Sequence, residues 1–487
     1  MEVAEPDFSV KKIVSRSIRT EYASATIRQA TSPKFKRQHR WLERPTMTMR
    51  VLLMAEACNP TWTSVPLVGY HFARALSEHP DLQVTLVSHV RNQSALESDA
   101  IADTARLVFV NNEWIAKPLF KLGSIVRGGK SLGWTTNMAI NWPAYIAFER
   151  QAYKTLKEEL ECGGYDLVHR ITPVSPTMPS PMAKWTDVPM LIGPLNGGLP
   201  WPSEYPELRK KEREWLVPVR NAYQKLPYYR SSYRRLAGVV AGSRHTATET
   251  PLDFSGEKFY MPENGIDPAK FQIADGWTAP TERFRFVSVG RLVPYKGFHL
   301  TVAAMARSAA LQNCDLTIIG DGPERERLQQ LAAELELSDR VRFAGWMPQE
   351  ELAAELRDSQ AFVFPSLREF GGGVVLEAMA SGLPSIIVNY GGPAELVTPQ
   401  TGFALELQHE DALVRELCVS METLVGDHGM CERMADAALH SVRSQHTWSA
   451  KADQMTRIYR QVLGGTSHRE RMQPTSSTGA SQQLVNV

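Results

Sequence analysis

The stretch from Ala361 to Pro384 restricts the possible folds of this chain more than any other part of it. Ala361–Phe364 is a short apolar run that predicts a buried parallel strand, three glycines follow at Gly371–Gly373, and Val374–Ala380 predicts a helix. A strand, a glycine loop and a helix in this order are typical of doubly wound α/β proteins. We therefore expect an open parallel sheet in this half of the chain.

The same stretch has the composition of an anion-binding corner. Glycines let the backbone approach a ligand, and the first N–H groups of a helix, here those of Gly371–Val374, favour an anion such as a diphosphate. Glu369 precedes the loop and Glu377 lies on the first turns of the helix. Because carboxylates repel phosphate, we expect the two carboxylates to bind hydroxyl groups, those of a sugar on one side and of a ribose on the other.

The spacing of Glu369 and Glu377 is that of an E-x7-E motif, and the residues from Glu377 to Pro384 read EAMASGLP. Here the chain resembles the C-terminal signature of retaining family-4 glycosyltransferases of the GT-B fold. The resemblance covers about residues 49–464 and implies an α/β architecture of two Rossmann-like doubly wound domains facing a central cleft. One departure is Glu369-Phe370-Gly371-Gly372, where the family usually has Glu-Gly-Phe-Gly.

The length of 487 residues predicts two domains with tails. We expect a disordered basic N-terminal extension at 1–48, an acceptor-binding Rossmann-like domain at 49–262, and a nucleotide-sugar-binding Rossmann-like domain at 263–445. The family resemblance implies a last helix, 446–464, that crosses back to the first domain. The segment 465–487 is rich in Ser, Thr and Gln, and we expect it to be disordered.

Composition excludes several classes of protein. The apolar fraction of 43% and the charged fraction of 22% are those of a globular protein, and a net charge of +1 does not favour nucleic acid as a partner. The five cysteines include no C-x-x-C pair, which suits a reducing cytoplasm. We find no apolar segment long enough to be a membrane span or a signal sequence, so we expect a cytoplasmic protein.

One stretch leaves contact with a membrane surface open. Between Tyr205 and Arg235, Lys and Arg outnumber Glu and alternate with aromatic residues. Such a stretch can bind anionic lipid headgroups at the inner membrane surface, or it can be a solvated helix face. We favour the solvated helix face and keep peripheral membrane contact as the alternative.

In the first domain, Arg50–Ala55 predicts the first strand and Pro66–Leu76 the first helix, with Ser64 available as an N-cap. The loop Glu56–Val65 between them lies at the carboxyl end of the strand, where open α/β sheets bind ligands. The family normally has a glycine pair in this loop. This chain has Cys58–Thr63, with the sequence CNPTWT, so any contact with a donor has to be made differently.

Two further segments of the first domain supply candidate site residues. Asp166–Thr172 predicts a strand, and the resemblance assigns it to the acceptor domain, which makes His169 a candidate catalytic residue. The loop Gly193–Pro202 is rich in Gly and Pro, and we interpret it as a rigid wall of the cleft in which Asn196 and Gly197 face donor or acceptor. We expect Val239–Ser243 to be the last strand of this domain.

A tight turn at Met261–Asp267 is expected to be the hinge between the domains. It resembles the Pro-Asn-Gly-Val-Asp turn of the family, with Glu263 inserted, and its Asn-Gly pair suits positive φ. The second domain then begins at Phe284–Val289. We expect Ser385–Val388, with Gly391, Gly392 and Glu395 after it, to complete the second sheet and its following helix.

The second domain supplies two cations. Gly290-Arg291 and Lys296-Gly297 lie in the loop after a predicted strand, where Arg offers a bidentate fork and Lys a mobile point charge. In the family this motif binds the diphosphate, which makes Gly290, Arg291 and Lys296 candidate site residues. The resemblance also implies that the backbone of Trp346 and Met347 holds the nucleotide base.

The implied reaction is transfer of a sugar, with retention, from a nucleoside-diphosphate sugar to a hydroxyl of a glycan, glycolipid or polysaccharide precursor. Arg291, Lys296 and the helix N-terminus would stabilise the departing diphosphate. No D-x-D sequence is present, so we expect no metal site and no cofactor beyond the co-substrate. A nucleotide-sugar epimerase of the same fold and a non-catalytic nucleotide-sugar-binding protein stay open as alternatives.

Overall fold

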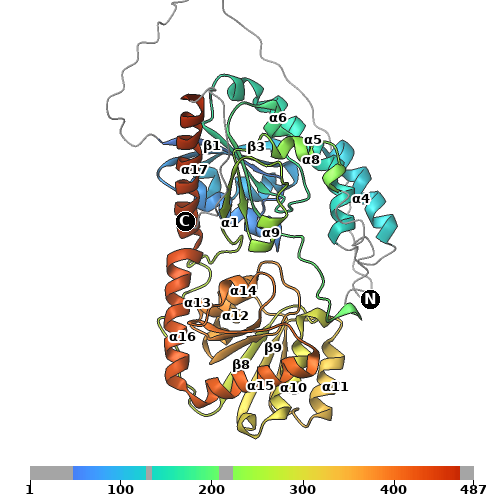
Figure 1. Ribbon diagram of the computed structural model, residues 1–487, viewed down its shortest axis with the longest axis vertical. Helices are drawn as coiled ribbons and strands as arrows, with labels where there is room; N and C mark the ends of the chain where they lie inside the picture. The colour runs from blue at the N-terminus through green and yellow to red at the C-terminus, as the bar shows by residue number, and fades with distance from the viewer. Residues whose placement is uncertain (1–47, 128–133, 208–222, 472–487) are drawn as a thin grey trace, which may run out of the picture. The chain divides into compact units, whose positions relative to one another are not determined.

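The computed structural model describes residues 48–127, 134–207 and 223–471, and two parallel β-sheets organise them (Figure 1). The two expected disordered ends lie outside these residues, except for Thr48 and 465–471. The middle of the basic stretch, 208–222, lies outside them as well.

The first sheet has seven parallel strands in the order β3-β2-β1-β4-β5-β6-β7. β1 has the sequence MRVLLMA and is buried along almost its whole length, as expected for a parallel strand covered by helices on both faces. The strands are β1 (Met49–Ala55), β2 (Leu82–His89), β3 (Ala105–Val110), β4 (Leu167–Thr172), β5 (Met190–Leu195), β6 (Gly238–Ala241) and β7 (Glu257–Tyr260).

The second sheet has six parallel strands in the order β10-β9-β8-β11-β12-β13. Both sheets therefore reverse their strand order once, between β1 and β4 and between β8 and β11, and such a reversal is where doubly wound sheets bind ligands. The strands are β8 (Phe284–Val289), β9 (Cys314–Ile319), β10 (Val341–Gly345), β11 (Ala361–Phe364), β12 (Ser385–Val388) and β13 (Gly402–Leu405).

Helices connect the strands on both sides of each sheet (Figure 1). Those of the first half are α1 (Val65–Ser77), α2 (Gln93–Glu97), α3 (Ile101–Thr104), α4 (Glu113–Arg127), α5 (Trp134–Glu161), α6 (Met182–Trp185), α8 (Tyr229–Tyr233) and α9 (Arg244–Thr248). Those that follow are α10 (Phe298–Arg307), α11 (Arg325–Glu334), α12 (Gln349–Arg357), α13 (Gly373–Ala380), α14 (Pro393–Leu396), α15 (Glu410–Gly426), α16 (His428–Ser441) and α17 (Trp448–Arg471).

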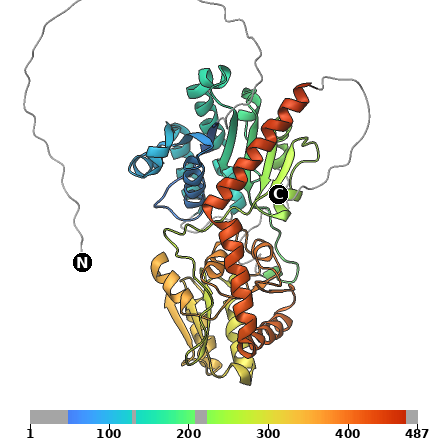
Figure 2. The same cartoon turned by 90° about the vertical axis from the view of Figure 1, so that its left-hand side faces the viewer.

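Alternating residues of β1 divide the first half into two cores. Val51 and Leu53 pack with α1, whereas Leu52 and Met54 pack with α5 on the opposite face. The apolar face of α17 (Met455, Ile458, Tyr459 and Val462) joins the core on the α1 side. Figure 2 shows α17 as the long red helix beside the first sheet.

Four local expectations are corrected. Ser64 does not cap α1 with its side chain, because its φ of 64° differs from the extended backbone of a capping serine. β6 is not the last strand of the first sheet, since β7 pairs with it in parallel. The second sheet ends with β13 rather than β12. The last helix continues to Arg471, beyond residue 464.

No helix in the described ranges combines the length and the hydropathy that crossing a lipid bilayer requires.

Candidate functional site

A pocket of about 540 Å³ lies at the reversal point of the second sheet and is also lined by residues of the first half. The glycine loop after β11 forms one wall with Phe370, Gly371–Gly373 and Val374. Gly372, with φ of 64°, precedes the first residue of α13, a backbone conformation that glycine adopts readily. The first N–H groups of α13 have no partner within the helix and lie at this wall.

Lys296 and Glu369 form an ion pair inside the pocket. The Lys296 ammonium also lies 4.7 Å from the centre of the Phe364 ring. Lys296 follows β8 and Glu369 follows β11, so the two central strands of the sheet each deliver one charge to the same place. A cation, a carboxylate and free amide groups together can bind a diphosphate beside a polyol.

Glu377 lines the same pocket from the first turns of α13. Burial raises the pKa of its carboxyl group to about 7, opposed by a 3.4 Å hydrogen bond from Gln349 Nε2. Its charge therefore changes near neutral pH, and the ionised form can accept two hydroxyl groups.

Asn196 and Gly197 line the pocket from the loop after β5. Asn196 Nδ2 donates to Glu263 Oε1 at 2.6 Å and to the backbone oxygen of Phe370 at 2.9 Å. Asn196 therefore connects the first half of the chain with the hinge and with the glycine loop.

Glu263 and Asn264, in the hinge, also line the pocket, and we did not predict them as site residues. Burial raises the pKa of Glu263, although the Asn196 hydrogen bond and the charge of Lys451 oppose the shift. Lys451 donates to the backbone oxygen of Pro262 at 2.6 Å, and burial lowers its pKa to about 7. The inserted glutamate in the hinge turn was the one sequence signal that could have indicated this cluster.

Other predicted residues lie away from this pocket. Arg291 is exposed in the loop between β8 and Lys296, and it does not line the pocket. Trp346 and Met347 follow β10; Trp346 is 75% exposed, and Met347 packs against the core of the second half. Gly290 packs against Gly320, where an added Cβ would lie 2.0 Å from the oxygen of Gly290. This close contact between two backbones requires glycine at position 320, independently of any ligand.

His169, a catalytic candidate from the sequence, does not line the pocket. It is fully buried, its Nε2 pairs with the backbone oxygen of Gly193 at 2.8 Å, and its Nδ1 pairs with the Tyr459 hydroxyl at 2.6 Å. Burial lowers its pKa to about 3, so the ring is neutral; Nε2 carries the hydrogen and Nδ1 accepts. With both nitrogens used, His169 joins β4, β5 and α17.

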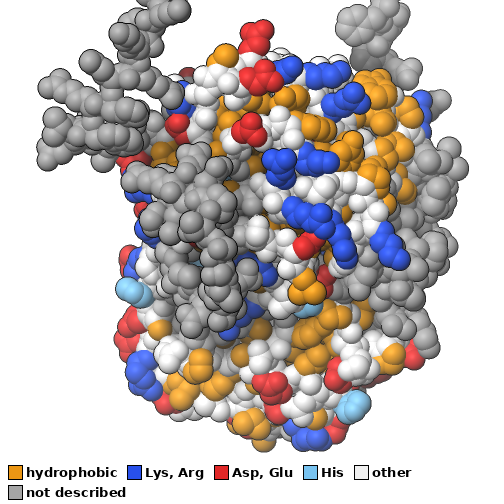
Figure 3. All heavy atoms as spheres, turned by 45° about the horizontal axis from the view of Figure 1, so that its top comes forward, with side chains coloured by type: hydrophobic (Ala, Val, Ile, Leu, Met, Phe, Trp, Pro, Cys, Tyr) orange, Lys and Arg blue, Asp and Glu red, His pale blue; other side chains and the backbone are white. Residues whose placement is uncertain are grey.

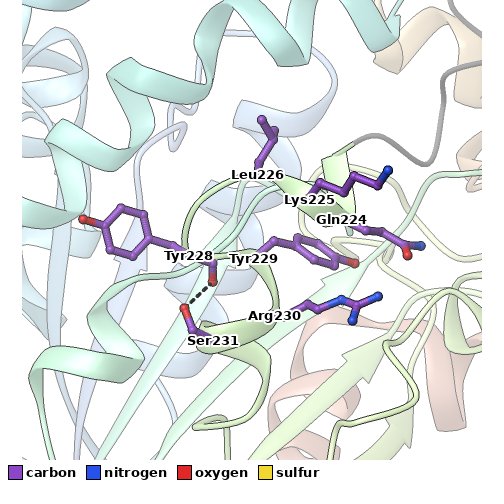
Figure 4. Close-up of a pocket in the computed structure, with 7 residues that line it drawn as sticks. All are labelled: Gln224, Lys225, Leu226, Tyr228, Tyr229, Arg230 and Ser231. Atoms are coloured by element: carbon purple, nitrogen blue, oxygen red, sulfur yellow. Dashed lines mark hydrogen bonds between the residues drawn. The ribbon is translucent and has the colours of Figure 1, made fainter.

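Two further cavities lie in the first half. One, of about 470 Å³, is formed by the short stretch Gln224–Ser231 around α8, where Tyr228 and Tyr229 point in opposite directions and Ser231 Oγ donates to the oxygen of Tyr228 (Figure 4). The residues before this stretch, 208–222, are outside the description. The other, of about 440 Å³, lies at the reversal point of the first sheet.

No group of three or more His, Cys, Asp or Glu side chains suited to a metal ion occurs in the described part of the chain.

Comparison with known proteins identifies relatives of the second half. Residues 270–439 match the family model described as glycosyl transferases group 1. The lipopolysaccharide core biosynthesis glycosyltransferase LpsE of Rhizobium meliloti is 33% identical over 168 residues, which are 34% of this chain and 47% of that protein. Glycogen synthase of Mycobacterium tuberculosis is 32% identical over 200 residues, 40% of this chain and 47% of that protein. The chain thus spans about half the length of these curated relatives.

Solved structures share the fold of nearly the whole described chain. Sucrose-phosphate synthase from Thermosynechococcus elongatus aligns with a TM-score of 0.59 at 18% identity, over 86% of this chain and 100% of the other. Anabaena HepE, solved with UDP and glucose, aligns with a TM-score of 0.51 at 17% identity, over 86% and 100% of the two chains. The expected GT-B architecture, with two Rossmann-like doubly wound sheets, is confirmed.

Proposed function

Residues 270–439 match the family model of glycosyl transferases group 1, and from this match we propose that the whole chain is a retaining glycosyltransferase that moves a sugar from a nucleoside-diphosphate sugar to a hydroxyl acceptor. One observation carries the proposal: Lys296, Glu369, the glycine loop and Glu377 all line a single pocket at the reversal point of the second sheet. The acceptor in this proposal is a glycan, a glycolipid or a polysaccharide precursor.

We place the donor in this pocket because the charged groups of the pocket complement those of a nucleoside-diphosphate sugar. The diphosphate binds at the N-terminus of α13 next to Lys296, the sugar hydroxyls bind Glu369, and the ribose binds Glu377. The proposal keeps Arg291, from the same loop as Lys296, as a second phosphate ligand, although its side chain does not line the pocket in this structure. The base lies toward the end of β10, against the backbone of Trp346 and Met347. The UDP in the HepE structure supports a donor of this class.

The pocket supplies what the bond cleavage needs. When the bond between the anomeric carbon and the diphosphate breaks, negative charge grows on the leaving oxygen, and the Lys296 ammonium and the α13 amides stabilise it. The departing phosphate then takes the proton of the acceptor hydroxyl, which attacks from the same face, so that the anomeric configuration is retained. Lys296 and Arg291 supply the positive charge, so the proposal includes no metal ion and no cofactor.

Thermal unfolding with UDP, GDP, ADP and their sugar conjugates tests the donor assignment. One of them at about 100 times its dissociation constant should stabilise the protein by about 2.7 kcal/mol. Lys296→Ala should weaken the binding of that nucleotide at least about tenfold through loss of a charged hydrogen bond. Lys270→Ala, an exposed lysine of the same half, is the matched control. A protein that no nucleoside diphosphate stabilises would refute the proposal.

Turnover separates the two alternatives. An epimerase converts the donor without an acceptor, and a binding protein converts nothing. A transferase releases the nucleoside diphosphate much faster when an acceptor is present, and Glu369→Gln should abolish most of this acceleration while the nucleotide still stabilises the fold.

A cytoplasmic location is a further part of the proposal, and peripheral contact at the inner membrane surface is kept as the alternative to a solvated face. Around α8, Leu252 is fully exposed and Lys184 lies 5.5 Å from the ring centre of Tyr228. Figure 3 shows Lys and Arg side chains beside hydrophobic ones on the forward face. Flotation with anionic vesicles should recover the protein, and Leu252→Ser with Lys184→Ser should reduce the recovery; equal recovery with neutral vesicles would contradict this contact.

A further inference from the structure

The cavity at the reversal point of the first sheet adjoins the donor pocket. It is lined by residues that follow β1, such as Glu56 and Trp62, by Arg91 after β2, and by residues that follow β4. Val65 and Val174 line both this cavity and the donor pocket. A molecule in the cavity, which we call the loop pocket, would therefore lie next to a donor bound beyond these two valines.

The loop with the sequence CNPTWT, which replaces the glycine pair of the family, builds one wall of the loop pocket. Asn59 holds the loop, because its Oδ1 accepts hydrogen bonds from Thr61 N and Oγ1 at 2.9 and 2.8 Å. Its Nδ2 donates to Asn92 Oδ1 at 3.3 Å, and its backbone N–H donates to the oxygen of Pro66 at 2.9 Å. Trp62 is presented from this loop with 46% of its surface exposed.

Among the described residues that line the loop pocket, Arg91 is the permanent cation, and it is paired with Glu113. Arg91 Nε donates to Glu113 Oε1 at 2.5 Å. His89 Nδ1 accepts the N–H of Arg91 at 3.1 Å, so the hydrogen is on Nε2, which pairs with Asn112 Oδ1 at 2.6 Å. Burial lowers the pKa of His89, which agrees with a neutral ring. The charge of Arg91 is balanced by that of Glu113, so the described lining of the loop pocket does not favour an anion.

Glu56 adds a carboxyl group to the same wall. Among the described residues no hydrogen-bond donor pairs with this carboxyl group, and burial raises its pKa against the opposing charge of Arg91. In its ionised form this carboxyl group repels phosphate or carboxylate, and in either protonation state it pairs with hydroxyl groups. An exposed indole face beside it suits the apolar face of a sugar ring.

We propose that the loop pocket binds the acceptor as an uncharged sugar ring, with Trp62 against its apolar face and Glu56 and Arg91 at its hydroxyls. The inference rests on the proposed transfer reaction and adds to it the chemical class of the acceptor: a neutral glycosyl unit rather than a sugar phosphate or an acidic sugar. The hydroxyl that accepts the new bond points past Val65 and Val174 toward the donor.

The test uses the full chain, the nucleotide sugar found by thermal unfolding, and two sets of probes. The neutral set is the methyl glycosides of glucose, galactose and mannose; the anionic set is glucose 1-phosphate, glucose 6-phosphate and glucuronate. Saturation-transfer NMR measures binding of each probe, and release of nucleoside diphosphate measures turnover. We expect binding and acceleration with at least one neutral probe and none with the anionic probes.

Two variants assign the effect to the loop pocket. Trp62→Ala and Glu56→Gln should each raise the KM for the neutral probe about tenfold or more, while the stabilisation by nucleotide and the KM for the donor stay within about twofold. Trp114→Ala, a tryptophan that is 74% exposed and does not line the loop pocket, should behave like the wild type.

Failure of this inference is distinct from failure of the proposed function. If a nucleotide stabilises the protein but the anionic probes bind and the neutral ones do not, or if no neutral probe binds, the inference is overturned and the donor assignment stands. Unchanged neutral-probe KM values in both variants overturn it as well. If no nucleotide binds, it is the transferase assignment itself that fails.

Discussion

Glu377 is the donor-pocket residue whose protonation should govern nucleotide affinity near neutral pH. Its pKa is raised to about 7, above the ordinary value for a glutamate, so the group is largely protonated at pH 6 and largely ionised at pH 8. Only the ionised form accepts two ribose hydroxyls. The ionised fraction rises about tenfold over this range, and UDP affinity should rise with pH by the same factor.

The comparison with Glu377→Gln isolates this effect, because ionisation of UDP itself affects both proteins equally. Titration calorimetry at pH 6, 7 and 8 should show a pH dependence about tenfold weaker in the variant than in the wild type. Glu350→Gln, at an exposed position, is the control. Identical pH profiles in the wild type and Glu377→Gln would remove Glu377 from the ribose site.

We expect His169 to contribute to stability rather than to the chemistry, because it is buried and both ring nitrogens are hydrogen-bonded. His169→Ala loses the pairings with Gly193 and Tyr459 and leaves a cavity, so the free energy of unfolding should fall by about 3 kcal/mol. Tyr459→Phe, which loses one of these hydrogen bonds, should cost about 1 kcal/mol. Denaturant unfolding measures both, and turnover per folded molecule should stay within about twofold.

The pH dependence of the His169 contribution has a definite sign. The folded-state pKa of about 3 lies below the ordinary 6.5, so the contribution is complete above about pH 6.5 and is lost as pH falls. The stability difference between the wild type and His169→Ala should therefore shrink by about 1–2 kcal/mol between pH 7 and pH 5. A large loss of turnover at unchanged stability would restore His169 as a catalytic candidate.

At the scale of elements, single Gly→Ala substitutions in the glycine loop and at the start of α13 test how tightly these elements pack. An added Cβ at Gly371 would lie 2.1 Å from Glu263 Oε1 and 2.3 Å from Asn264 Nδ2, whereas at Gly373 the nearest such atom is Asn264 Cγ at 3.6 Å. Gly371→Ala should therefore cost about 1–3 kcal/mol of stability. Gly373→Ala should change stability by no more than about 0.5 kcal/mol.

Gly371→Ala and Gly373→Ala also test how closely a nucleotide approaches the loop. If the diphosphate approaches the first amides of α13 closely, Gly373→Ala should weaken UDP binding about tenfold at nearly unchanged thermal unfolding. Full UDP affinity in Gly373→Ala would mean that the phosphates bind elsewhere. Full stability in Gly371→Ala would mean that the hinge can move away from the loop at little cost.

At the scale of the whole molecule, Trp448 joins the hinge to the first half. The backbone N–H of Trp448 donates to the backbone oxygen of Ile266 at 3.1 Å. The indole ring stacks on the His71 ring with centres 5.6 Å apart, and the residue is 7% exposed. Ile266 N–H in turn donates to the oxygen of His446 at 2.7 Å. The start of α17 is thereby fixed to both α1 and the hinge turn.

Trp448→Ala should cost about 3–5 kcal/mol, and the loss should fall on the first half. Calorimetry should show the unfolding separating into two transitions, of which UDP stabilises only the one that belongs to the second half. The exposed Trp114→Ala should unfold like the wild type. A single transition that shifts uniformly would show that the two halves unfold as one unit regardless of Trp448.

Local sequence patterns predicted those elements whose signal lies in one continuous stretch of the chain. The strand, glycine loop and helix at 361–380 and the strand at Phe284–Val289 could be predicted because period and glycine placement are local properties. The tight turn expected at Met261–Asp267 is wrong, since neither Asn264 nor Gly265 has a positive φ. β7 was missed, because a four-residue strand with the sequence EKFY has little apolar pattern and becomes a strand through its pairing with β6.

The tertiary structure alone decided which of these residues meet. Asn196 contacts the oxygen of Phe370, 174 positions away in the chain, and His169 pairs with Tyr459, 290 positions away. No local pattern encodes either contact, because each depends on how sheets and helices pack. For the same reason Glu263 and Val174 escaped prediction, and of the loop pocket only the loop Glu56–Val65 was expected at a ligand-binding edge. The charges of Lys296 and Glu369 could be predicted, but their ion pair could not.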